Sequence, residues 1–117
     1  MNAQLSPART ATDAATRTIA VAHGDGIGPE IMDAVLHVLR HVAPNLQLQP
    51  VTMGEAAYRS GHMNGILPQT WDILAEHPVL LKSPMTTPQG GGYKSINVTL
   101  RKTLGLFANV RPCVAYH

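Results

Sequence analysis

Residues 82–101 read KSPMTTPQGGGYKSINVTLR, and this stretch contains the most informative pattern of the sequence. A short apolar strand is predicted to end at Lys82, at the edge of an α/β sheet where ligands usually bind. A loop with two prolines and three consecutive glycines follows at residues 83–94. Ser95 then suits the N-cap of a helix that runs to about Leu104. The stretch therefore predicts a strand, a loop and a helix that face one ligand-binding edge.

Strands and helices alternate along the rest of the chain. The pattern predicts strands at 18–23, 46–53, 79–82 and 106–116, and helices at 29–42, 54–60, 68–76 and 95–104. Pro29 suits the first position of the first helix, and Pro50 indicates an edge strand or a bulge. The buried stripe of that helix is predicted to be Ile31, Ala34, Val35, Val38, Leu39 and Val42. This alternation predicts an α/β fold with a mostly parallel sheet.

Composition limits the class of protein. With 117 residues, 44% hydrophobic and 14% charged, the chain predicts one globular domain at most. A net charge of +2 without a basic run argues against a nucleic-acid partner, and no apolar stretch has the length of a membrane span. The lone Cys113 is typical of a reducing compartment, so we expect a cytoplasmic protein. Residues 1–16 lack apolar periodicity and are expected to form a disordered tail.

The first glycine turn, GDGIGPE at residues 24–30, invites comparison with a dinucleotide fingerprint. Pro29 occupies the position of the third glycine, and Asp25 and Glu30 place negative charge where a phosphate would bind. A phosphate cradle is therefore not expected, and a tight strand-to-helix turn competes evenly with a direct ligand role. His37 and His41 are spaced i, i+4 but have no third ligand nearby, so we expect a solvated face and no metal site there.

Three cations and two neutral donors surround the glycine loop in the sequence. Lys82, Arg101 and Arg111 suit the carboxylates of a small polyacid, and Ser95 and Asn97 can fix its orientation. In the competing interpretation, Arg101 lies on a solvated helix face, Lys82 extends to solvent and Ser95 only caps the helix. Spacing alone leaves these two interpretations evenly balanced.

Two motifs carry a family resemblance. GDGIGPE after the first strand and LKSPMTTPQGGGYKSINVTLRKTLGLFANVRPC, residues 81–113, together resemble the isocitrate and isopropylmalate dehydrogenases. The resemblance implies the isocitrate/isopropylmalate dehydrogenase-like α/β fold, which is not a Rossmann fold, and implies that only its N-terminal part is present. Residues 17–106 would begin the large domain, and residues 107–117 would start a strand that crosses to the small domain. We therefore expect an N-terminal fragment that is inactive alone.

The same resemblance implies the roles of individual residues. The Ser-x-Asn pattern at Ser95 and Asn97 resembles the pattern that isocitrate enzymes of the family carry at this place. Isopropylmalate enzymes have apolar residues there instead. The resemblance implies that isocitrate is contacted by Ser95, Asn97, Arg101 and Arg111, and that Lys82 supports the same site. It also implies that Thr87 lies between the substrate and the nicotinamide, with Thr86 beside it. Ile27 would line the cofactor cleft.

The implied reaction is the oxidative decarboxylation of isocitrate to 2-oxoglutarate and CO2, a step of the tricarboxylic acid cycle. Its cofactors would be NADP or NAD and Mg2+ or Mn2+. The catalytic tyrosine, a second lysine and the acidic metal ligands are expected beyond the chain end, so no catalytic or metal residue is assigned here. The complete enzyme is expected to be a homodimer. Three alternatives remain open: a related substrate such as isopropylmalate, homoisocitrate or tartrate, a non-catalytic regulatory or binding fragment, and an inert remnant.

Overall fold

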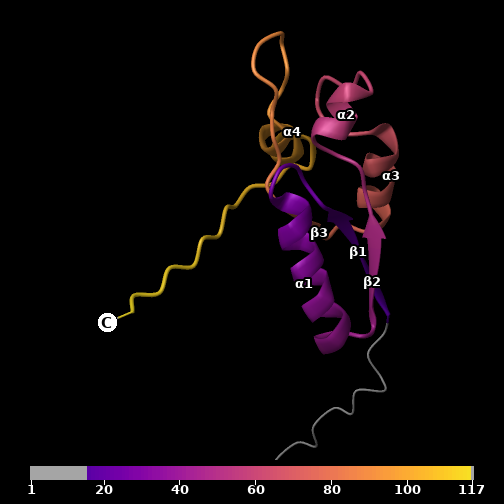
Figure 1. The fold of residues 1–117 in the computed structure, drawn as a ribbon, viewed down its shortest axis with the longest axis vertical. Coiled ribbons are helices and arrows are strands. Elements are labelled where there is room, and N and C mark those ends of the chain that lie inside the picture. Colours follow the sequence, from indigo (N-terminus) through magenta and orange to yellow (C-terminus); the bar gives the residue numbers. More distant parts are fainter. Residues whose placement is uncertain (1–15, 117) are drawn as a thin grey trace, which may run out of the picture.

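A three-stranded parallel sheet forms the centre of the fold in a computed structural model that describes residues 16–116 (Figure 1). The strands are β1 (Arg17–Ala22), β2 (Leu46–Pro50) and β3 (Leu80–Lys82), in the order β2-β1-β3. The prediction of an α/β fold with a parallel sheet is confirmed. Parallel pairing places the carboxyl ends of all three strands at one edge, so the turns that follow β1 and β3 are brought together.

The second strand is shorter than predicted. The sequence predicts that it reaches Met53, but it ends at Pro50, and the N–H of Val51 just beyond it still donates to the carbonyl oxygen of Val21 at 2.9 Å. Met53 instead forms an isolated antiparallel bridge with Ile66. As Pro50 indicated, β2 is an edge strand.

The helices of the described chain are α1 (Gly28–Val42), α2 (Glu55–Arg59), α3 (Pro68–Glu76) and α4 (Ile96–Thr103). A proline lies in the first turn of both α1 and α3, where its missing N–H costs no helical hydrogen bond. All four predicted helices are present, and the bounds of α3 match the prediction. No helix within residues 16–116 combines the length and apolarity that crossing a membrane requires.

Helices cover both faces of the sheet, so the fold has three layers (Figure 1). Side chains alternate along β1: Val21 packs with Met32 and Leu36 of α1, whereas Ala20 and Ala22 face the opposite side. The core on that opposite side also contains Met53, Tyr58, Ile66, Leu74, Ile96 and Leu100, from α2, α3, α4 and their connections. The small alanines of β1 leave room for these larger side chains.

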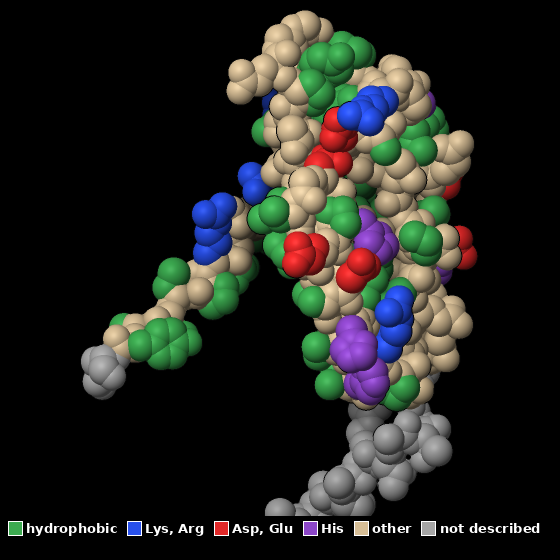
Figure 2. All heavy atoms as spheres, in the orientation of Figure 1, with side chains coloured by type: hydrophobic (Ala, Val, Ile, Leu, Met, Phe, Trp, Pro, Cys, Tyr) green, Lys and Arg blue, Asp and Glu red, His purple; other side chains and the backbone are tan. Residues whose placement is uncertain are grey.

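The predicted buried face of α1 is wrong. The helix buries Gly28, Met32 and Leu36 against the sheet, with Leu39 half-buried. The predicted stripe is mostly exposed, and Val42 is 70% exposed. Figure 2 shows hydrophobic side chains on the surface along α1. The helix has two adjacent apolar faces, and the sheet covers only the one on which residues 32, 36 and 39 lie.

The predicted strand at residues 106–116 is also wrong. This segment has no strand pairing and leaves the body of the fold (Figure 1, yellow), with Phe107 fully exposed. A strand needs a neighbour to receive its backbone hydrogen bonds, and the described residues provide none for this segment. The prediction of a disordered tail at residues 1–16 lies outside the described residues apart from Thr16, and the proposed domain bounds stay a prediction.

Candidate functional site

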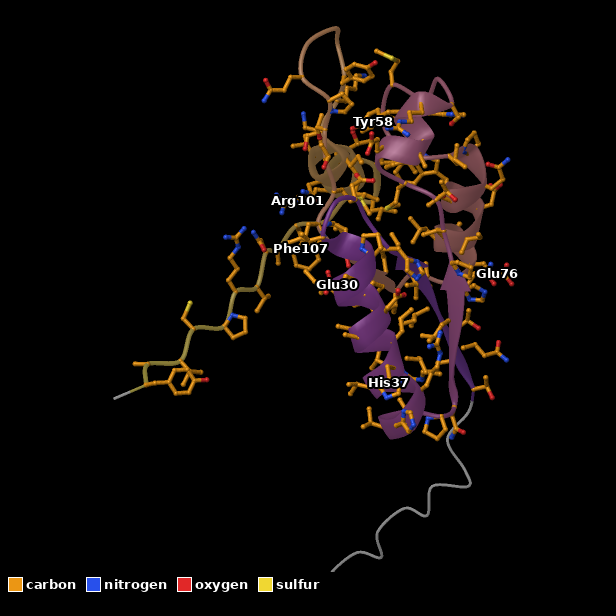
Figure 3. The ribbon with its side chains drawn as sticks, viewed as in Figure 1. Glu30, His37, Tyr58, Glu76, Arg101 and Phe107 are labelled. Atoms are coloured by element: carbon orange, nitrogen blue, oxygen red, sulfur yellow. The ribbon has the colours of Figure 1, made fainter. Side chains whose placement is uncertain are left out.

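Three of the predicted site residues line one pocket at the carboxyl end of β3. The pocket has a volume of about 280 Å³ and lies between the strand and α4. Its lining consists of Pro78, Leu80, Lys82, Asn97, Leu100, Arg101, Leu104 and Leu106. Asn97 and Arg101 are four residues apart and therefore project from the same side of α4. Figure 3 shows Arg101 projecting from α4 above Phe107, where the chain leaves the body of the fold.

The pocket is electropositive. Burial lowers the pKa of Lys82 from its ordinary value of 10.5, and the nearby charge of Arg101 lowers it further. The Lys82 ammonium donates a hydrogen bond to the carbonyl oxygen of Ser83 at 3.1 Å. Neither cation forms an ion pair with an acidic side chain within residues 16–116. An anion in this pocket would relieve the repulsion between the two cations and favour the charged form of Lys82.

Ser95 lies on a different side of α4. It is the N-cap residue, as predicted, but its side chain forms no capping hydrogen bond. It lines a separate depression of about 440 Å³, together with Lys94, Val98, Thr99, Lys102 and Thr103. The two polar residues of the Ser-x-Asn pattern, Ser95 and Asn97, therefore line different pockets at the start of α4.

The other predicted residues are more dispersed. Arg111 lies in the exposed 106–116 segment and contacts neither pocket. Thr86 is exposed and Thr87 half-buried in the loop after β3. Ile27, the residue before α1, is 67% exposed. The structure thus brings Lys82, Asn97 and Arg101 together and leaves Arg111 and Ile27 apart from them.

The glycine turn after β1 packs against the start of the loop after β3. The N–H of Asp25 donates to the carbonyl oxygen of Pro84 at 2.9 Å, and the N–H of Gly28 donates to the carbonyl oxygen of Asp25 at 2.8 Å. A Cβ atom on Gly24 would lie 2.2 Å from the Pro84 oxygen, so only glycine permits this approach. The buried Ser83 hydroxyl donates to the Gly28 carbonyl at 3.0 Å. These contacts favour the structural role of the turn, and the residues do not fit a pyrophosphate cradle.

Two residues to which the sequence assigned no role in positioning the loop hold it at both ends. The Asp25 carboxylate accepts hydrogen bonds from the N–H groups of Glu55 and Thr86, at 2.9 and 2.8 Å. At the other end, the Tyr58 hydroxyl donates to the carbonyl oxygen of Lys94 at 2.6 Å. The Tyr58 ring also meets Tyr93 edge to face, with ring centroids 5.3 Å apart. Their partners lie 61 and 36 residues away in sequence, so no local motif indicates them.

The described residues offer no ready site for a catalytic metal. No group of three or more His, Cys, Asp or Glu side chains within residues 16–116 is arranged to hold an ion.

Comparison with known proteins relates this geometry to one family. A sequence model of the family described as isocitrate/isopropylmalate dehydrogenase matches residues 18–117. The NADP isocitrate dehydrogenase of Rickettsia typhi is 52% identical over 99 residues, which cover 85% of this chain and 20% of that relative. A mitochondrial regulatory subunit of the NAD isocitrate dehydrogenase of Dictyostelium discoideum is 36% identical over 92 residues, 79% of this chain and 24% of the relative.

A solved structure with the same fold agrees. The chain matches the apo crystal structure of a beta-decarboxylating dehydrogenase from Thermococcus kodakarensis with a TM-score of 0.70 and 32% sequence identity. The match covers 78% of this chain and 27% of that one. The chain therefore spans about a fifth to a quarter of the length of the relatives it matches.

Proposed function

The chain belongs to the isocitrate/isopropylmalate dehydrogenase family, and on that basis we propose that it is the N-terminal portion of an isocitrate dehydrogenase and supplies isocitrate-binding residues. The complete enzyme would oxidise and decarboxylate isocitrate to 2-oxoglutarate and CO2. We further propose that the complete enzyme is a cytoplasmic homodimer and that the 117 residues alone have no activity. The name of the Rickettsia typhi relative supports isocitrate as the substrate.

One observation carries the proposal: Lys82, Asn97 and Arg101 line the same pocket, and its two cations have no acidic partner in the described chain. Isocitrate carries three carboxylates. The guanidinium of Arg101 can bind one of them in a bidentate manner, the Lys82 ammonium adds a second charge, and the Asn97 amide donates to a carboxylate or hydroxyl oxygen. Arg111 would add a third cation when the 106–116 segment is held beside the site.

The polar residues of α4 favour isocitrate over isopropylmalate. An isopropyl group against the Asn97 amide would leave a desolvated polar group unpaired, at a cost of roughly 1–3 kcal/mol, and the Ser95 hydroxyl would add a similar cost if the bound acid extends to its side of α4. A carboxylate in the same place would accept their hydrogen bonds. The preference for isocitrate over isopropylmalate would therefore depend on whether the polar side chains at the start of α4 keep hydrogen-bond partners when the acid binds.

Binding and orientation are the roles proposed for this chain. When bound in the complete enzyme, NADP or NAD supplies hydride acceptance, and Mg2+ or Mn2+ supplies Lewis-acid charge stabilisation. Thr86, Thr87 and Ile27 would contact the nicotinamide side of the cleft. Lys82 and Arg101 would bind the carboxylates of the substrate, and Asn97 would set its orientation.

A second candidate is a regulatory subunit that binds isocitrate without turnover. The similarity to the regulatory subunit of Dictyostelium discoideum favours it. Both candidates use the same pocket, and they differ in whether the complete protein turns isocitrate over.

Calorimetric titration of the 117-residue chain with isocitrate tests the binding role. We expect saturable binding that Arg101→Gln weakens by on the order of tenfold, because a charge-assisted pair is lost. Arg40→Gln, which removes an exposed cation from the last turn of α1, is the matched control and should leave the affinity unchanged. Equal weakening by both variants would reduce the effect to net charge and contradict the proposal. An assay with isocitrate, Mn2+ and either nucleotide should show no turnover by this chain.

A further inference from the structure

His37 and His41 lie one turn apart on the exposed side of α1, near its carboxyl end, where Figure 3 labels His37. Their ring centroids are 4.7 Å apart, and the ring planes are inclined by 51°. Figure 2 shows histidine side chains side by side at this end of α1, open to solvent on the face in view. The solvated face expected from the sequence is therefore present, and it holds two imidazoles in contact.

The tautomer of His41 is determined by its hydrogen bond. Its Nδ1 lies 2.7 Å from the carbonyl oxygen of His37. A carbonyl oxygen can only accept, so Nδ1 carries the proton and the neutral ring keeps its lone pair on Nε2. Histidines that bind metals characteristically donate their other N–H to a carbonyl or carboxylate in this way. The His37 ring has no hydrogen bond or ion pair within the described residues, so its nitrogens are free to turn toward the same point.

The separation of the rings suits a shared ion. With metal–nitrogen distances near 2.1 Å and a nitrogen–metal–nitrogen angle between about 90° and 109°, the two ring centroids would lie roughly 4.5–5.2 Å apart. The observed 4.7 Å lies within this range. Because α1 is a regular helix at these positions, the backbone positions of the two ligands are fixed, and the hydrogen bond of His41 also orients its ring before an ion binds.

The sequence predicts no metal site at this pair, but from the geometry of the two rings we propose that His37 and His41 form a two-ligand surface site for a divalent transition-metal ion, with water completing the coordination. The site is separate from the pocket beside α4 and does not rest on the proposed isocitrate role. It needs no third protein ligand, which agrees with the absence of any three-residue group of ligands in the described chain.

The surrounding charges indicate the class of ion. Asp33 lies one turn before His37 and is 3.7 Å from His23, so it adds negative charge on the approach to the pair. The carboxyl end of the helix favours cations, whereas the neighbouring Arg40 opposes them. Two imidazole nitrogens favour Cu2+, Ni2+ and Zn2+ over Mg2+ and Ca2+, which prefer oxygen ligands. A fully hydrated Mg2+ should therefore not compete.

Calorimetric titration of the full 117-residue chain with Ni2+, in a non-chelating buffer, tests the site. All variants carry Cys113→Ser, which removes the exposed thiol as a rival ligand. We expect one saturable site that is unaffected by excess Mg2+. His37→Gln and His41→Gln should each weaken binding on the order of 100-fold, because a chelate becomes a single ligand. His62→Gln and His77→Gln should leave the affinity unchanged.

A diamagnetic ion gives an independent readout. Sub-stoichiometric Zn2+ should shift the imidazole resonances of His37 and His41 before those of the other histidines. Both side chains are exposed, so circular dichroism should show the same fold in every variant. The proposal is overturned if both single variants bind Ni2+ as tightly as the chain that carries Cys113→Ser alone, or if the first resonances to move belong to other histidines.

Discussion

The Asp25 carboxylate accepts a hydrogen bond from the backbone N–H of Thr86 at 2.8 Å, and this contact joins the turn after β1 to the loop after β3. Its other oxygen accepts the N–H of Glu55 at 2.9 Å, at the start of α2. One side chain thus satisfies donors from two segments distant in sequence. It fixes the loop that carries Thr86 and Thr87 at the edge of the sheet where the candidate site lies.

Asp25→Ala should lower the free energy of unfolding by about 1–3 kcal/mol, because two backbone donors lose a charged acceptor. Urea denaturation followed by circular dichroism measures the change. Amide hydrogen exchange at Thr86 should accelerate at the same time. Asp72→Ala, at an exposed position of α3, is the control and should change stability by less than about 0.5 kcal/mol. Unchanged exchange at Thr86 in the Asp25 variant would show that this carboxylate does not hold the loop.

Substitutions of two glycines in the same turn distinguish the cost of backbone strain from the cost of steric crowding. Gly24 and Gly26 both have positive φ, 76° and 58°. An added Cβ on Gly24 would meet the Pro84 oxygen at 2.2 Å, whereas none of the described atoms lies within 4 Å of one on Gly26. Gly26→Ala should therefore cost about 1–2 kcal/mol from conformation alone. Gly24→Ala should cost a further 1–3 kcal/mol or so from the forced displacement. If chemical denaturation shows the same loss of unfolding free energy for both variants, the turn after β1 is not in close contact with Pro84.

Tyr58→Phe should destabilise the far end of the glycine loop by about 1 kcal/mol, since the Lys94 carbonyl loses its hydrogen-bond donor. Limited trypsin digestion followed by mass spectrometry should show faster cleavage after Lys94. Tyr93→Phe keeps the edge-to-face ring contact and removes a hydroxyl that forms no hydrogen bond within the described chain, so it serves as the control. If both variants are cleaved at the same rate, the Tyr58 hydroxyl does not anchor the loop.

Arg101→Gln should raise the pKa of Lys82 toward its ordinary 10.5, because one of the two causes of the lowering is removed. Nuclear magnetic resonance titration of the Lys82 side chain measures the shift, and Lys102→Gln is the control.

The lowered pKa of Lys82 means that the folded state releases this proton at a lower pH than the unfolded state does. Stability therefore rises with pH from the lowered pKa up to 10.5, and this rise should be smaller in Arg101→Gln. A pKa that fails to move would place the two side chains too far apart to interact.

Local signals in the sequence were sufficient for most of the secondary structure. Prolines at the first turns of α1 and α3 mark both helix starts, and the apolar runs that form β1 and β3 were recognised from composition alone. Local signals could not decide which apolar face of α1 the sheet covers, because residues 31, 35 and 38 repeat with the same period as residues 32, 36 and 39. They also could not show that residues 106–116 have no strand beside them.

The candidate site was predictable to a similar extent. Asn97 and Arg101 share a helix face by spacing, and Lys82 ends a strand that leads to the same edge, so their meeting in one pocket follows from local rules and parallel topology. The separation of Ser95 from Asn97 also follows from spacing, because residues two apart at the start of a helix do not face the same side, whereas the existence of a second depression there needed the structure. Asp25 and Tyr58 act through partners distant in sequence and needed the structure.

Lys82, Asn97 and Arg101 are proposed to form an isocitrate-binding surface. The most direct measurement is a titration of the isotope-labelled 117-residue chain with isocitrate, followed by nuclear magnetic resonance, with isopropylmalate as the comparison. We expect saturable shifts centred on the Lys82, Asn97 and Arg101 side chains, and weaker binding of isopropylmalate. Shifts that spread evenly over exposed cations such as Arg40 and Arg59, or equal binding of the two acids, would contradict it.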